Sequence, residues 1–578
     1  MGMPNPAALR MALQLVLITA AACSPALQPG PGDAPGSETG APKVLTIAIQ
    51  REPQTFGTFV GSQGSAGPTT HVAQIVHNYL AIENERGVRQ PQLAVDLPSV
   101  EKGTWRLNPD GSMDTTWRVR PNIKWHDGTP FTSADLLFSF TANRDPDLPR
   151  PIGRAARLME SATAPDAHTL IVHWATTYVR ADEDAGLGPL ASHLVEDLYR
   201  TDKQAFVNGP HFTTEFVGLG PYRLVTWEQS SHIELARFDD YFLGRPPLDK
   251  VIVRFVDDPN TMIANILAGA VDVVLPPGVG MQNAVEIKQR WEGTGNQVHV
   301  GLTAGLEQVE FQHRPEYARP TGGITNRLVR QGLFYAMDRA ALVEVATHGF
   351  APAADSWLRP DDPIRPEVES AIPQYPYDPS RAQQLLTQSG WTRGADGALV
   401  HAENRERFEL EIRAREAASE RGMNIIADQW KAVGVQSTLL VVPPSRRQDI
   451  EYEATRPGVL ISNPRGDSLY GDRLHSRTLS SASTRWQGSN KAGYSNPRAD
   501  DLFDQLSLTI ATSQRAALQR EALREVFDDL AIMPLFWEIQ PILALGDVKA
   551  RLGGTEPTWN IFEWDKVRPR DYDVGTSR

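Results

Sequence analysis

The chain has 578 residues, a formal net charge of −13 and a sequence pI near 5.5. Its length exceeds one ordinary hydrophobic core and predicts about two to four domains, while 41% hydrophobic and 22% charged residues are typical of a soluble globular protein. Nucleic acid is bound through clustered lysine and arginine, and no basic stripe is present, so the acidic composition argues against a nucleic-acid partner.

The N-terminal segment has the pattern of a lipoprotein leader. Arg10 precedes an apolar run, Met11 to Ala22, which has signal-peptide length and is too short to span a membrane. Cys23, the single cysteine, follows three alanines, where a bacterial lipoprotein signal ends and the thiol receives a diacylglyceryl group. We expect residues 1–22 to be a signal peptide and Cys23 to be lipidated; the alternative is a stray thiol.

Residues 24–43 are dense in Pro, Gly, Ser and Ala and have no apolar periodicity, so they predict a disordered tether. The folded part should begin after them, with a strand at Val44–Gln50. Its β-branched residues suit a buried first strand, and a loop from Glu52 to Phe56 ends it.

The next strong local signal reads strand, turn, helix. Residues Thr115 to Arg120 alternate with the period of a half-buried strand, and Asp127-Gly128 is a turn dipeptide, because Gly accepts positive φ without a Cβ penalty. Thr132 and Asp135 have the spacing of a capping box, so a helix should begin there.

His126 and Asp127 permit two interpretations, a structural turn or a catalytic acid-base pair. Neither has a nucleophile, a second carboxylate or a metal ligand at a recognisable spacing, so we interpret them as a turn. His193 and His211 are too far apart for a metal spacing and are interpreted as structural or solvated.

A further strand is expected at Thr169 to Trp174, and a strand–helix–strand pattern follows later in the chain. Val251 to Val256 reads as a strand, the helix after it should stop at Gly269, and Val271 to Leu275 reads as the second strand. This spacing predicts a βαβ unit and a partly parallel sheet.

After Val300 the pattern becomes more helical. The elements expected there are two helices within residues 328–349 with Asp338 as the cap between them, a helix after Asp378, strands around residues 408–412 and 435–442 flanking a helix at residues 419–433, a helical pair after Pro497, and a last strand from Pro534.

Several motifs occur in a characteristic order. They are Lys124–Phe131, Gly218–Leu224, Tyr241–Lys250, Arg330–Arg339, Tyr377–Trp391 and Gly493–Pro497. Together they resemble the extracellular solute-binding proteins of family 5, the oligopeptide-, dipeptide- and nickel-binding components of ABC importers. The resemblance covers roughly residues 44 to 565.

The resemblance implies an α/β fold, a two-lobed, periplasmic-binding-protein-like clamshell with mixed sheets, a two-crossing hinge and an extra domain inserted in lobe one. The implied boundaries are residues 44–80, 215–300 and 530–578 for lobe one, 81–214 for the inserted domain and 301–529 for lobe two. A hinge of this kind lets the cleft close over a small molecule.

The resemblance also indicates the binding residues. In this family an Asp of lobe two pairs with the α-amino group of the ligand; the corresponding residue is Asp467, with Arg465 beside it and Asn463 where the family has Trp. Asp467 could receive an ammonium or be held internally by Arg465. The loop with Thr55 and Phe56 is expected at the mouth of the cleft. The resemblance implies no catalytic residue, metal or cofactor.

The expected function is that of a lipid-anchored binding protein that captures a short peptide and delivers it to the permease subunits of an ABC importer. It should act as a monomer in the cell envelope, in the periplasm or at the outer face of the cytoplasmic membrane. The alternatives are the same role for a nickel complex, an opine or an oligosaccharide, a receptor that signals rather than imports, and a cleft hydrolase.

Overall fold

The computed structural model describes residues 41–56, 68–149, 152–183, 187–415, 420–467, 469–554 and 556–567. The expected signal peptide, Cys23 and nearly all of the tether lie outside these ranges. Among the residues described, no helix is both long enough and apolar enough to cross a membrane.

Within the described ranges, ten strands form one mixed sheet in the order β16-β15-β17-β12-β18-β11-β1-β10-β9-β8. Their bounds are β1 Val44–Ile49, β8 Tyr222–Glu228, β9 His232–Arg237, β10 Lys250–Phe255, β11 Val273–Val274, β12 Gln297–Phe311, β15 Glu409–Ala414, β16 Gln436–Val441, β17 Val459–Ser462 and β18 Ile532–Ala544. The strands of the first lobe and those of the second lie at opposite ends of this order.

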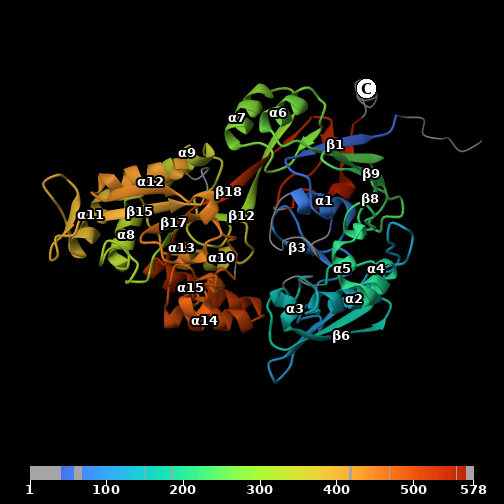
Figure 1. Cartoon of the computed structure of the whole chain (residues 1–578), viewed down its shortest axis with the longest axis horizontal. Coiled ribbons are helices and arrows are strands. Elements are labelled where there is room, and N and C mark those ends of the chain that lie inside the picture. The colour runs from blue at the N-terminus through green and yellow to red at the C-terminus, as the bar shows by residue number, and fades with distance from the viewer. Residues whose placement is uncertain are drawn as a thin grey trace, which may run out of the picture. The chain divides into compact units, whose positions relative to one another are not determined.

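Two long antiparallel strands, β12 and β18, join the two ends (Figure 1). β18 pairs with β11 of the first lobe, and β12 pairs with β17 of the second. The helical pattern expected after Val300 therefore begins later, because β12 continues as a strand to Phe311. β12 pairs with β18 on both sides of two register shifts, and this long-range pairing outweighs the weak helical pattern of the local sequence.

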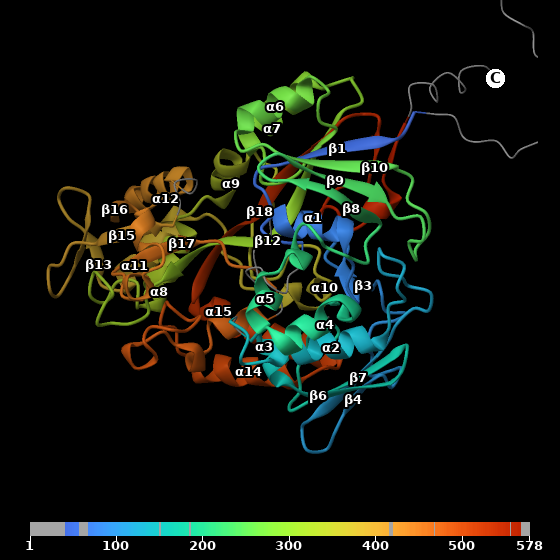
Figure 2. The ribbon, with the colours of Figure 1, turned by 45° about the vertical axis from the view of Figure 1, so that its right-hand side comes forward.

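The first lobe contains the predicted βαβ unit. β10 and β11 both pair with β1 in parallel, and α6 (Pro259–Leu267) connects them. Asp258 caps this helix by accepting a hydrogen bond from the N–H of Thr261, and Gly269 follows its end at φ +71°. α6 and α7 (Met281–Arg290) lie beside the junction of β11, β12 and β18 (Figure 2).

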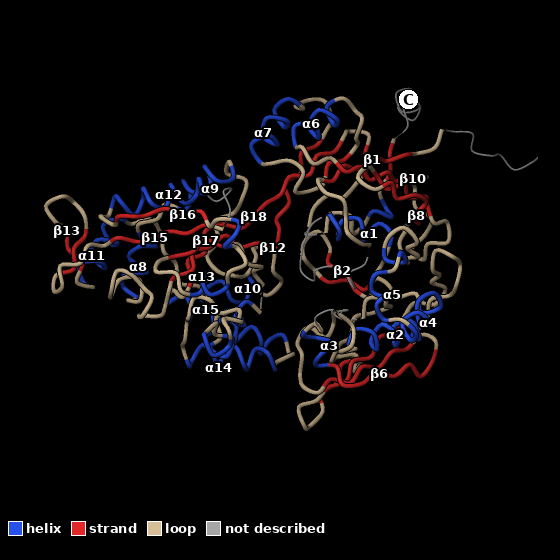
Figure 3. Tube along the Cα trace, in the orientation of Figure 1, coloured by secondary structure: helices blue, strands red, loops and turns tan. Residues whose placement is uncertain are grey.

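The inserted segment has a sheet of its own, in the order β4-β5-β7-β6. Its bounds are β4 Trp105–Leu107, β5 Met113–Arg118, β6 Met159–Asp166 and β7 Thr169–Trp174, with the helices α2 Ser133–Arg144, α3 Arg154–Leu158, α4 Ser192–Thr201 and α5 Lys203–Asn208. α2 packs on β6 and β7, and Figure 3 shows α2 beside β6. The predicted capping box of Thr132 and Asp135 is present at the start of α2.

The predicted turn is held by its neighbours. Gly128 has φ +90°, and His126 donates from Nε2 to the Gly220 carbonyl at 3.0 Å and accepts from the Gly218 N–H at 3.2 Å. Burial lowers the pKa of His126 to about 4, so the ring is neutral. Asp127 Oδ2 accepts a hydrogen bond from His193 at 2.7 Å. These contacts give both histidines the structural role expected from the sequence.

The glycines of the second motif are required by a close approach of two backbones. α1 (Pro68–Val76) ends against them, and a Cβ on Gly218 would stand 2.0 Å from the Val76 carbonyl oxygen. A Cβ on Gly220 would stand 2.3 Å from the Val76 carbonyl carbon. The motif therefore joins α1 to the turn at His126.

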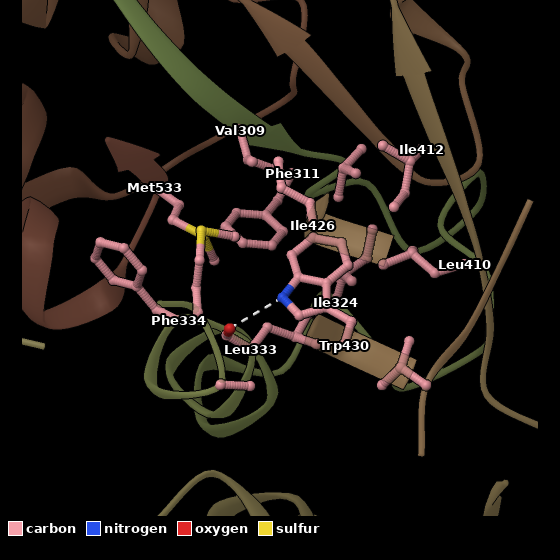
Figure 4. Packing of buried hydrophobic residues seen from close by; sticks show 14 of the residues in the cluster. Val309, Phe311, Ile324, Leu333, Phe334, Leu410, Ile412, Ile426, Trp430 and Met533 are labelled. Carbon is pink, nitrogen blue, oxygen red and sulfur yellow. Dashed lines mark hydrogen bonds between the residues drawn. The ribbon is translucent and has the colours of Figure 1, made fainter. Parts of the chain in front are cut away.

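The second lobe combines strands β15, β16 and β17 with helices, of which α12 packs on β15 and β16. The bounds are α8 Arg327–Tyr335, α9 Arg339–Thr347, α10 Arg365–Val368, α11 Pro379–Gln388, α12 Glu420–Ala432, α13 Ile450–Ala454, α14 Pro497–Leu508 and α15 Thr512–Asp529. Trp430 of α12 is fully buried, and its indole N–H donates to the Leu333 carbonyl at 3.0 Å (Figure 4). Asp338 and Asp378 cap α9 and α11 as predicted.

Candidate functional site

A cavity of about 330 Å³ lies between the inserted segment and the second lobe. One wall comes from the hairpin of β2 (Ala81–Glu83) and β3 (Arg89–Pro91) and from the loop after β7; the other comes from the loop before α10, the segment after β17, and α15. The lining residues are Glu83, Arg86, Gly87, Val88, Arg89, Val179, Arg180, Asp182, Glu183, Arg359, Asp361, Asp362, Pro363, Arg465, Gly466, Asp467 and Arg515.

The cavity wall is dominated by charge, with six arginines and six carboxylates. Two ion pairs connect the inserted segment to the second lobe across it: Arg180 Nη1 lies 3.2 Å from Asp467 Oδ2, and Arg465 Nη2 lies 3.4 Å from Glu83 Oε1. Arg154 and Asp472 form a third pair between the same two regions. Closely balanced charge of this kind suits a polar solute that carries both signs.

Asp467 lies on the second-lobe wall, where the segment after β17 runs beside β12. Besides Arg180, it contacts Arg465 Nε at 3.4 Å, and its Oδ1 accepts a hydrogen bond from the Leu469 N–H at 2.9 Å. Its side chain is 26% exposed. The structure thus brings Asp467 and Arg465 together at the cavity and gives the carboxylate two arginine partners.

The other expected binding residues lie elsewhere. Asn463 is exposed and does not line the cavity. Phe56 is fully buried in the first-lobe core, with its ring centroid 5.2 Å from that of Phe216 and 4.7 Å from that of Trp227. Thr55, beside it, is half-buried and also does not line the cavity.

Arg89 and Arg180 are site residues that the sequence analysis did not identify. Arg89 contacts Asp182 at 2.9 Å and also pairs with Glu183, and Arg180 pairs with Glu183 and Asp467. Burial alone would lower the pKa of Arg180, but the carboxylates of Glu183 and Asp467 raise it. No local spacing marks these residues, because their partners come from other elements.

The chemistry of the wall is that of recognition by charge. Among the described residues that line it there is no serine, threonine, cysteine, lysine or histidine that could serve as a nucleophile or a histidine base. Within the described ranges, no group of three or more His, Cys, Asp or Glu residues is placed to hold a metal ion. What the wall offers a bound molecule is guanidinium and carboxylate groups.

The fold consists of two sets of strands and helices joined by a pair of long strands. Together with the charged cavity between the inserted segment and the second lobe, it defines a two-lobed binding protein. The family model described as "Bacterial extracellular solute-binding proteins, family 5 Middle" matches residues 98–495. The chain belongs to this family.

Individual relatives agree with this assignment. Heme-binding protein A of Haemophilus influenzae is 25% identical over 473 residues, covering 78% of this chain and 79% of that protein. The structure of AppA from Bacillus subtilis with a nonapeptide aligns with a TM-score of 0.66 at 18% identity, covering 91% of this chain and all of that one. NikZ from Campylobacter jejuni with Ni(L-His) gives 0.68 at 20% identity, with the same coverage. The expected two-lobed α/β fold is confirmed.

Proposed function

We propose that this protein is the solute-binding lipoprotein of an ABC importer, and that it captures a short peptide in the cavity between its lobes and delivers it to a membrane permease. The observation that carries the proposal is the cavity itself, lined by six arginines and six carboxylates from both sides of the cleft. Family membership supports the role in solute capture.

The size and charge of the cavity suit a small peptide. Its volume of about 330 Å³ is at the lower end of ordinary small-molecule sites. A peptide with free termini carries one ammonium and one carboxylate, and a wall with both signs of charge can pair with each. Among the relatives, AppA was solved with a nonapeptide, and others bind heme or Ni(L-His), so the competing candidate is a non-peptide solute.

Asp467 can receive the ammonium of the peptide by exchanging partners. Arg180 contacts both Asp467 and Glu183. An incoming ammonium displaces Arg180 from Asp467, and Arg180 keeps its second carboxylate, so no guanidinium is left unpaired by the exchange. Arg465 likewise keeps Glu83. In this proposal Asp467 and Arg465 contact the ligand.

The attachment to the membrane is part of the same proposal. Lipidation at Cys23 supplies the two or more acyl chains that stable anchoring needs, and residues 24–43 connect this anchor to the folded part. We assign residues 44–80, 215–300 and 530–578 to the first lobe and residues 301–529 to the second. Residues 81–214 are the domain inserted in the first lobe. The protein then works as a monomer at the outer face of the cytoplasmic membrane or in the periplasm.

Native mass spectrometry of the purified protein, followed by calorimetric titration with a library of di- to pentapeptides, tests this function. We expect a co-purifying peptide or saturable binding of at least one library member. A co-purified metal complex or sugar with no peptide binding would replace the peptide with that solute. Hydrolysis of any library peptide during titration would favour the cleft hydrolase.

A further inference from the structure

A small apolar cluster joins the two lobes beside the connecting strands. Its members come from α7, β12, α9, the loop after α9, and β18, and they include Met281, Leu302, Val343, Phe350, Ala351 and Ile539. Met281 belongs to the residues of the first lobe, whereas Val343, Phe350 and Ala351 belong to those of the second. None of these six residues lines the cavity. The lobes therefore contact each other at a second place, which takes no part in holding a solute.

On the second-lobe side, Phe350 is fixed in position. The chain reverses direction after α9 at Gly349, which has φ +73°, and the Phe350 N–H donates to the Thr347 carbonyl at 3.1 Å. Just beyond, the Trp537 N–H of β18 donates to the Pro352 carbonyl at 3.1 Å. The loop that carries Phe350 is thus bound at one end to α9 and at the other to β18.

On the first-lobe side, α7 is equally fixed. Ile287 and Trp291 pack in a first-lobe cluster with residues of α6. Met281 and Lys288 are seven residues apart and so lie on one side of the helix. Met281 packs on the cluster between the lobes, and Lys288 Nζ lies 4.8 Å from the ring centroid of Phe350, a cation–π contact. α7 therefore meets Phe350 as part of a rigid unit.

The cluster and the cavity lie on opposite sides of the connecting strands. Figure 1 and Figure 2 show α7 and α9 on one side of β12 and β18, and α10, whose preceding loop lines the cavity, on the other. When the cavity opens, the lobes separate on its side of the strands and approach each other on the opposite side. There α7 and Phe350 are already in contact, and close-packed side chains resist further compression.

We propose that Met281 and Lys288 of α7 form, with Phe350, a stop that limits how far the cavity opens. The stop keeps Arg180 and Asp467, which pair across the cavity at 3.2 Å, within a short distance of each other when that pair is broken. A narrow range of open arrangements lowers the ordering cost of closing on a solute. The inference is independent of which solute the protein binds.

Small-angle X-ray scattering of the unliganded protein tests the stop. The protein is first freed of any co-purified solute by partial unfolding in urea and dialysis. It is then measured in about 1 M salt, where the screening length of about 3 Å weakens the ion pairs across the cavity, so that the lobes open as far as the stop allows.

Removing the aromatic ring should let the cavity open further. A compact chain of this size has a radius of gyration of about 24 Å, and Phe350→Ala should exceed the parent by on the order of 1 Å. Phe350→Trp keeps a large ring at the same position and should not exceed the parent. Met281→Ala removes the apolar contact from the first-lobe side and should increase the radius in the same direction as Phe350→Ala.

Tyr377→Ala is the matched control, because Tyr377 is an aromatic residue of the same lobe whose side chain is 54% exposed, and it should scatter as the parent does. Thermal unfolding identifies any variant that does not fold; if Phe350→Ala is one, Met281→Ala decides. A radius no larger than the parent's in either variant, when folded, would overturn the stop. An equal increase in Tyr377→Ala would overturn it as well, because the opening would then not depend on this contact.

Discussion

Replacing Asp467 with Ala separates its two possible roles. The carboxylate holds Arg180 from across the cavity and Arg465 from its own segment, and its side chain is 26% exposed. If a peptide ammonium also binds there, truncation leaves a desolvated charge unpaired and costs about 2 kcal/mol or more, which is roughly a thirtyfold loss of affinity.

The effect on the unliganded protein is smaller. Of the two arginine contacts of Asp467, the one with Arg180 crosses between the inserted segment and the second lobe, and these two side chains are 29% and 26% exposed. Solvent screening reduces such a pair to about 0.5–1 kcal/mol, so the population in which the inserted segment and the second lobe are in contact should fall by a factor of about two to five. High salt should have the same effect on the parent, because it screens the pair.

Calorimetry with the tightest library peptide measures the first effect, and small-angle X-ray scattering of the unliganded protein at low and high salt measures the second. Arg446→Ala is a suitable control, because its pair with Asp449 at 3.2 Å lies away from the cavity. Unchanged peptide affinity together with a more open or less stable unliganded protein would refute the ammonium role and leave Asp467 as an internal ion-pair residue.

Three further substitutions have expected outcomes. Cys23→Ser should move the protein to the soluble fraction, and retention on the membrane at the parent's level would refute lipidation. Gly128→Val should lower the melting temperature, because φ +90° costs a branched residue about 1–3 kcal/mol, as thermal unfolding would show. His126→Ala should lower stability through its lost contacts to Gly218 and Gly220 but should change peptide affinity little, and a large loss of affinity without a change in melting temperature would refute that.

Local signals predicted those parts of the fold that are set by short-range chemistry. The capping box of Thr132 and Asp135, the caps Asp338 and Asp378, and the turn at Gly128 each depend on residues within a few positions of one another. The structure confirms them because backbone geometry and capping hydrogen bonds act at that range.

The cavity could be predicted only in part. Asp467 and Arg465 were found through the family resemblance, whereas Arg180, Arg515 and Asp362 come from separate elements that meet only in the folded chain. The strand beyond Val300 was missed for a related reason, since β18, its partner over most of its length, lies more than 200 residues away in the chain. Pairings of that range leave no periodic trace in a local window.

The ladder between β12 and β18 has a mechanical consequence. Its register shifts between Leu302 and Leu306, which pair with Ile539 and Trp537, so two extra residues of β12 bulge from the ladder midway between the lobes. The regular ladder is interrupted there and again between Glu307 and Gln308, so this stretch should be the most easily bent part of the β12–β18 pair. The lobes would then swing about a fixed pivot in the connecting strands themselves, with the pairing on either side kept intact throughout each cycle of loading and release.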